Sequence, residues 1–135
     1  MENLHSGSCL CGQVKYEIEG SFDSFYLCHC NYCQKDTGSA HAANLFSTMA
    51  KLNWTAGKDK IKTFNLPSTQ HTKSFCPECG SAVPNQQMNG KLLVVPAGSL
   101  DSKITITPNA HIFYSSKAEW DEELERIKKF EKLPS

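Results

Sequence analysis

Cys76-Pro77-Glu78-Cys79-Gly80 is the stretch of sequence that decides the fold. Its C-x-x-C-G pattern is typical of a zinc knuckle, in which two sulfurs reach the same side of a tight turn and the glycine lets the backbone pass close to the ion. A knuckle supplies two ligands, whereas a structural zinc ion takes four. The second pair must come from elsewhere in the chain, and we propose Cys9 and Cys11. A zinc ion held in this way joins two distant segments and contributes to the free energy of folding.

The remaining cysteines form a second group within Cys28-His29-Cys30-Asn31-Tyr32-Cys33. Three thiolates with the spacing C-x-C-x-x-C can converge on one ion from a single loop. A catalytic zinc ion typically keeps three protein ligands and leaves its fourth position to water or substrate. Because the chain has seven cysteines, their division into four and three predicts two zinc ions per chain. One is structural, and the other, at Cys28, Cys30 and Cys33, is catalytic.

Other interpretations of the cysteines stay open. Both sites would be structural if a histidine such as His29, His41 or His71 supplied an eighth ligand. An iron–sulfur cluster at C-x-C-x-x-C is a further alternative, although such clusters usually take four thiolates. Buried cysteines that serve only as small hydrophobic residues would rarely form three groups with ligand spacing. Because His29 lies between two ligands in the sequence, we expect its side chain to point away from the ion.

Composition and charge limit the class of protein. A chain of 135 residues has a common size for one domain, so we expect a single domain over residues 1–135. The 14 basic residues balance the 14 acidic residues and are scattered along the sequence, which argues against a nucleic-acid partner. The N-terminus lacks the pattern of a signal peptide, and no apolar run approaches the ~20 residues that cross a bilayer. We therefore expect a cytoplasmic protein without a membrane partner, in which an odd number of cysteines argues against disulfides.

Hydrophobic alternation predicts a mainly β fold. The clearest segment is 13–19, where apolar residues alternate with polar neighbours in the manner of a half-buried strand. Turn residues separate further short segments of this kind. These expected strands cover residues 41–46, 51–55, 60–64, 73–75, 91–95, 104–106 and 110–114.

A short helix is expected near the C-terminus. Ser116 and Glu119 have the spacing of a capping box, and Leu124 and Ile127 follow at helical spacing. Pro134 would end this helix.

Several of these motifs together resemble the glutathione-dependent formaldehyde-activating enzyme family, whose domain is shared with centromere protein V. The resemblance covers most of the chain and is carried by residues 7–14, 28–35, 38–40, 75–81, 96–101 and 111–120. It implies an Mss4-like β-tent, in which short antiparallel sheets surround a structural zinc ion and a short C-terminal helix follows.

The family resemblance also implies an activity and a set of ligands. It implies a carbon–sulfur lyase that interconverts glutathione and formaldehyde with S-hydroxymethylglutathione, so the expected partner is a small thiol or thiol adduct. It implies that the structural zinc ion is bound by Cys9, Cys11, Cys76 and Cys79. It implies that the catalytic zinc ion is bound by Cys28, Cys30 and Cys33. The alternative is a non-catalytic zinc module that binds a partner protein, as other Mss4-like folds do.

A mechanism follows from the predicted open position. A thiol bound there would favour its thiolate form, and the thiolate would attack an aldehyde carbon to give a hemithioacetal. Three protein thiolates leave a zinc site with a net charge of about minus one, which weakens its action on a carbonyl group. Lys35, Ser39 and His41 are candidates for tuning the charge and hydrogen bonding near this site.

Overall fold

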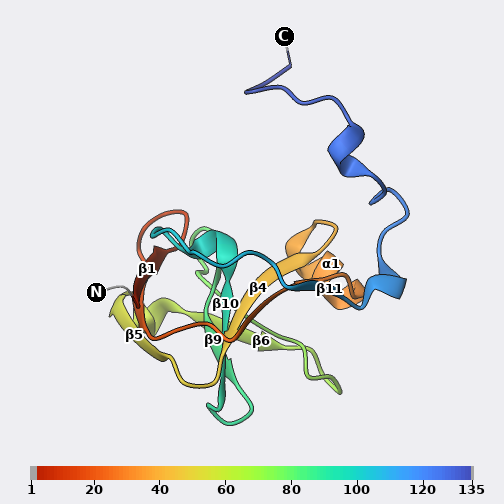
Figure 1. Ribbon diagram of the computed structural model, residues 1–135. Helices are drawn as coiled ribbons and strands as arrows, with labels where there is room; N and C mark the ends of the chain where they lie inside the picture. Colours follow the sequence, from red (N-terminus) through yellow and green to blue (C-terminus); the bar gives the residue numbers. More distant parts are fainter. Residues whose placement is uncertain (1–2, 135) are drawn as a thin grey trace.

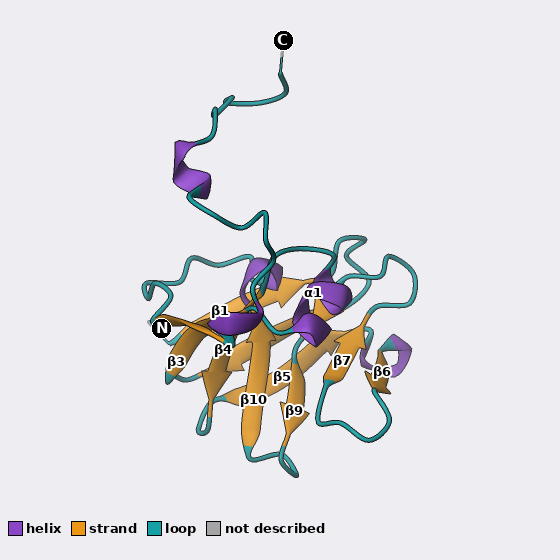
Figure 2. Cartoon of the chain, turned by 90° about the vertical axis from the view of Figure 1, so that its right-hand side faces the viewer, coloured by secondary structure: helices purple, strands orange, loops and turns teal. Residues whose placement is uncertain are grey.

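The computed structural model describes residues 3–134, whose strands form three small sheets. The first sheet has the order β1-β2-β5 and contains β1 (Leu4–Ser8), β2 (Lys15–Glu19) and β5 (Lys51–Ala56). The second has the order β11-β3-β4-β10-β9 and contains β3 (Ser24–Cys28), β4 (Ala42–Ser47), β9 (Asn85–Gln87), β10 (Leu92–Pro96) and β11 (Ala110–Ile112). The third has the order β6-β7-β8 and contains β6 (Lys62–Asn65), β7 (Thr72–Phe75) and β8 (Ala82–Val83). In Figure 2 the strands β4, β5, β9 and β10 lie below the helix α1 (Asn31–Thr37).

The main hydrophobic core lies between the first and second sheets. Tyr16 and Ile18 of β2 pack with four apolar side chains of the second sheet, namely Phe25, Leu45, Leu93 and Val95. Each fully buried side chain of this size stabilises the fold by about 1.5–3 kcal/mol. The hydroxyl group of Tyr16 also forms a hydrogen bond of 2.5 Å with Ser99 Oγ, so the polar end of this buried ring has a partner.

The mainly β character expected from the sequence is confirmed. The alternating segment forms β2, in which Tyr16 and Ile18 are buried and Lys15 and Glu19 are exposed. Strands also form at most of the other expected positions, with ends shifted by a few residues. No strand forms at 104–106. Ile104 packs against the main core, but Pro108 lacks the amide hydrogen that a continuing sheet ladder would need.

The sequence patterns did not indicate β1, β3 or the only α-helix of residues 3–134, α1 (Asn31–Thr37). This helix buries just one side chain, Cys33, so it lacks the apolar stripe that marks a helix in a sequence. Cys30 caps its first turn, and Gly38 ends it with the left-handed φ of 66° that glycine adopts without cost.

The expected C-terminal helix is reduced to a single 3-10 turn at Leu124–Arg126. Beyond the last strand the chain runs away from the sheets (Figures 1 and 2), and Ile127 and Phe130 are exposed. A short helix is marginal in water unless its apolar face packs on another element, and this segment has no such surface beside it. No helix within residues 3–134 has the length and apolar character needed to cross a membrane.

We predict that Gly57→Ala destabilises the protein more than Gly90→Ala. Both glycines have a left-handed backbone, with φ of 74° and 82°. A Cβ atom at residue 57 would also lie 2.3 Å from the carbonyl oxygen of Gln13, whereas at residue 90 the nearest atom is 3.9 Å away. The backbone cost is about 1–2 kcal/mol at both positions, and the clash adds about 1–3 kcal/mol at residue 57 alone. Urea denaturation measures both, and equal losses would contradict the clash.

Candidate metal centres

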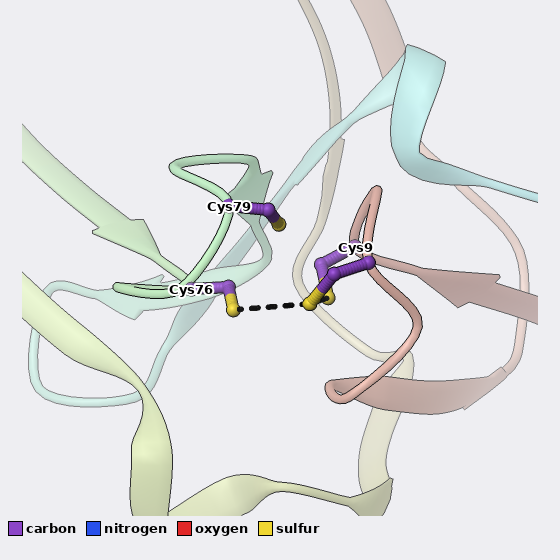
Figure 3. A group of neighbouring side chains, drawn as sticks. Cys9, Cys76 and Cys79 are labelled. Carbon is purple, nitrogen blue, oxygen red and sulfur yellow. Dashed lines mark hydrogen bonds between the residues drawn. The ribbon is translucent and has the colours of Figure 1, made fainter.

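Two turns bring together the four-cysteine cluster, which consists of Cys9, Cys11, Cys76 and Cys79. The first pair lies in the turn between β1 and β2, and the second lies in the turn between β7 and β8. Figure 3 shows Cys9, Cys76 and Cys79 with their sulfurs turned toward a common point between the two turns. The Cys11 sulfur is 3.6 Å from that of Cys9 and 3.9 Å from that of Cys76.

These sulfur positions fit a tetrahedral zinc ion. Four ligands at the usual Zn–S distance of ~2.3 Å lie about 3.8 Å from one another, and the two sulfur–sulfur distances measured at Cys11, 3.6 and 3.9 Å, bracket that value. All four sulfurs lie within 4.8 Å of one another. The four-cysteine cluster can therefore hold zinc with little rearrangement.

Hydrogen bonds from the surrounding backbone and side chains lower the pKa of Cys9 and of Cys79 and so favour their thiolates, whereas the pKa of Cys11 is raised to about 11 by burial and by the neighbouring cysteines. The amide of Val14 donates to Cys9 Sγ at 3.2 Å. The hydroxyl of Ser81 lies 3.4 Å from Cys79 Sγ, and hydrogen bonding to Ser81 lowers the pKa of Cys79 to about 5. Ser81 Oγ in turn accepts a hydrogen bond of 2.9 Å from the amide of Leu10, so one serine joins the two turns that carry the sulfurs.

The four-cysteine cluster is part of a second hydrophobic core. Cys9 and Cys76 are buried together with Val14 and Val83, and Trp54 packs against this group from β5. Because Trp54 also contacts the main core, the two cores share one side chain. A metal ion in the four-cysteine cluster would therefore stabilise the packing of both hydrophobic cores as well as the two turns that carry the cysteines.

The three-cysteine cluster consists of Cys28, Cys30 and Cys33, whose sulfurs also lie within 4.8 Å of one another. Cys28 ends β3, Cys30 precedes α1, and Cys33 lies in its first turns. Burial raises the pKa of Cys28 and of Cys33. Burial has the same effect on Cys30, but hydrogen bonds outweigh it and lower the pKa of Cys30, among them one from the Cys33 amide at 3.3 Å. A divalent ion binding here would displace the remaining thiol protons.

The three-cysteine cluster opens into a pocket of about 370 Å³. One wall is apolar and includes Ala42, Val94 and Ile112. A second wall is polar, because Asp36 of α1 binds Lys73 Nζ at 2.9 Å and His71 Nε2 at 2.8 Å. Sulfur ligands, an apolar surface and a charged group therefore face one cavity, as in many small-molecule sites.

Only some of the side chains that the sequence suggested as neighbours of the three-cysteine cluster line the pocket. His71 lines the pocket, whereas Lys35 and Ser39 do not. The charged side chains beside the pocket are those of Asp36 and Lys73, whereas Lys35 had been expected there. Residue spacing does not predict this ion pair, because a contact between α1 and β7 depends on the tertiary fold. Trp120 is 63% exposed and does not line the pocket beside the three-cysteine cluster.

His29 lies in a third group, the histidine–aspartate cluster, which consists of His29, His41 and Asp121. The His29 ring is 1% exposed, and its Nε2 atom lies 2.8 Å from His111 Nδ1. Burial lowers the pKa of His29, which favours the neutral imidazole. Asp121 Oδ2 approaches His29 Nδ1 at 3.3 Å. The sequence gave no sign of this cluster, because its members are far apart in the chain.

Comparison with known proteins identifies a family and similar solved structures. The model of a family described as "Glutathione-dependent formaldehyde-activating enzyme" matches residues 4–116. A crystal structure of a Rhodobacter sphaeroides protein is similar in fold, with a TM-score of 0.56. The two sequences are 22% identical, and the similarity covers 73% of this chain and 90% of that one. Both cysteine clusters lie within the matched residues.

We predict that Ser81→Ala makes the protein lose zinc at a higher pH. The hydroxyl keeps the pKa of Cys79 near 5, so its removal raises that pKa and protons compete for the sulfur earlier as the pH falls. Zinc release during an acid titration, followed with a colorimetric chelator, should show a midpoint shifted upward. Ser115→Ala, at another exposed serine, should leave the midpoint unchanged, and an unshifted midpoint for Ser81→Ala would contradict the assignment.

Proposed function

The chain belongs to the glutathione-dependent formaldehyde-activating enzyme family, and from this premise we propose that it is a zinc-dependent carbon–sulfur lyase acting on a small thiol adduct such as S-hydroxymethylglutathione. The observation that carries the proposal is the opening of the three-cysteine cluster into the pocket of about 370 Å³. A protein that used this cluster only for stability would gain nothing from a cavity against its sulfurs.

We propose different roles for the two cysteine clusters. The four-cysteine cluster offers a full ligand set and is packed into a hydrophobic core, which is typical of a structural zinc site. The three-cysteine cluster supplies three ligands and adjoins the pocket, which is typical of a catalytic site with one position for substrate. A zinc ion held by Cys28, Cys30 and Cys33 would supply positive charge that favours the thiolate form of a substrate sulfur.

The reaction breaks or forms one carbon–sulfur bond. In the cleavage direction, the hydroxyl group of the adduct loses its proton, the carbonyl double bond forms, and the sulfur leaves with the bonding electrons as a thiolate. In the reverse direction, the thiolate adds to the aldehyde carbon and the oxygen takes up the proton. Neither direction consumes an oxidant or reductant.

The protein groups around the pocket bind and orient the adduct. The apolar wall excludes water from the reacting carbon and sulfur, which strengthens electrostatic interactions there. Lys73 and His71 are held in place by Asp36 at 2.9 and 2.8 Å, so they present fixed polar groups to a substrate. A peptide-like thiol has carboxylate and amide groups that such side chains bind.

We predict about two zinc ions per purified chain, with different consequences when each cluster is disrupted. Cys76→Ser should abolish or strongly weaken folding, because structural zinc in small domains supplies about 10–16 kcal/mol and typical proteins are stable by only about 5–15 kcal/mol. Cys30→Ser should stay folded with about one zinc. Plasma mass spectrometry and circular dichroism measure these outcomes. Equal destabilisation by the two changes would favour two structural sites.

We also predict that the protein accelerates exchange between glutathione, formaldehyde and their adduct. NMR exchange spectroscopy measures this rate directly, with and without protein. Cys30→Ser should reduce the rate to that of the uncatalysed mixture, because one sulfur ligand beside the pocket is lost. Ser39→Ala, at an exposed position outside the pocket, should retain the full rate. A wild-type protein with two zinc ions and no effect on exchange would exclude this substrate pair.

A further inference from the structure

The histidine–aspartate cluster takes no part in the proposed reaction, although its buried atoms need a partner. His29 lies between two cysteines of the three-cysteine cluster in the sequence, and adjacent side chains of an extended segment point to opposite sides. Its ring therefore faces His41 and Asp121, with the His29 and His41 ring centroids 5.2 Å apart. Three ligand atoms from three separate segments converge here within 4.8 Å.

Two ring nitrogens in this cluster are buried without a hydrogen-bond partner. His29 Nδ1 and His41 Nδ1 are both inaccessible to solvent, and neither forms a hydrogen bond within residues 3–134. Asp121 Oδ2 lies 3.3 Å from His29 Nδ1, but the two atoms are not aligned for a hydrogen bond. A buried polar atom without a partner costs about 1–3 kcal/mol, so two such atoms in one cluster of ligand-type side chains indicate that something binds there.

The neighbouring histidine explains how His29 can act as a ligand. When His29 Nε2–H donates to His111 Nδ1 over their 2.8 Å separation, the lone pair of His29 lies on Nδ1, the atom that faces Asp121. Metal-binding histidines commonly use their second ring nitrogen in this way, which fixes the ring and its tautomer. In this arrangement a lone pair meets a carboxylate oxygen, and a cation between them removes the repulsion.

We propose that His29, His41 and Asp121 form a third metal site, which binds a divalent ion such as zinc independently of both cysteine clusters. Two imidazole nitrogens and one carboxylate oxygen are ligands that suit zinc and similar borderline ions. Zn–N and Zn–O distances of ~2.0–2.2 Å require the ligand atoms to come somewhat closer to one another than the present limit of 4.8 Å. The proposal goes beyond the proposed lyase function and does not depend on it.

The site would also anchor the C-terminal segment to the body of the protein. Asp121 belongs to the part of the chain that leaves the sheets, whereas His29 follows β3 and His41 precedes β4. A metal ion shared by these residues would hold the start of that segment against the loop that carries the three-cysteine cluster.

The test counts zinc ions in the full-length protein and in matched variants. Each protein is dialysed against buffered zinc, and bound metal is measured by plasma mass spectrometry. After this loading the wild type should bind one zinc ion in addition to the two expected at the cysteine clusters, and His41→Ala and Asp121→Asn should each lack that additional ion. His5→Ala is the matched control, because His5 Nδ1 is also buried without a partner but lies outside the cluster, and it should bind as much zinc as the wild type.

A second readout separates this site from the cysteine clusters. Cobalt bound by thiolates gives strong sulfur-to-metal charge-transfer absorption, whereas cobalt bound by imidazole and carboxylate does not. Cobalt added to wild type that carries zinc in its two cysteine clusters alone, before any zinc loading, should give the weak visible bands of a nitrogen and oxygen site, and Asp121→Asn should lose them. Equal zinc counts in all four proteins, together with no such bands, would mean that only a proton occupies the cluster and would overturn the proposal, whatever the result of the lyase assay.

Discussion

The convergence of two turns on four sulfurs is the constraint on which the rest of the structure depends. The turn after β1 belongs to the first sheet and the turn after β7 to the third, and within residues 3–134 no strand pairing joins these two sheets. Their connection passes through the four-cysteine cluster, the buried side chains around it and the hydrogen bonds of Ser81. Small sheets expose much of their surface and need such a connection to bury a sufficient core.

The position of the third sheet in turn creates the pocket. Lys73 and His71 reach the pocket from β7 and the loop before it, while Asp36 and the three sulfurs come from α1 and the end of β3. The four-cysteine cluster, which connects the third sheet to the first, therefore also positions one wall of the candidate active site. This arrangement places the sulfurs of the three-cysteine cluster on or beside defined secondary structure, where their positions can be maintained to within a few tenths of an ångström.

The sequence was most informative where chemistry depends on local spacing. The C-x-x-C-G turn and the C-x-C pairs predicted which sulfurs gather, because their ligand geometry is set within a few residues. It was least informative for α1, whose residues bury only Cys33, and for the segment near Leu124, where a helical pattern has no surface to pack on. The ion pair between Asp36 and Lys73, and the meeting of His29 with Asp121, arise from chain topology. Such contacts leave no periodic signal in a single sequence.

The parallel pairing of β11 with β3 has a consequence for the order of events on the ribosome. Synthesis runs from the N-terminus, so every sulfur of the four-cysteine cluster has been made once Cys79 is in place. The outer edge of β3, the strand that ends in Cys28, stays uncovered until Ala110–Ile112 has emerged to pair with it. An uncovered edge can pair with other chains. The four-cysteine cluster can thus assemble while the edge of β3 is still uncovered.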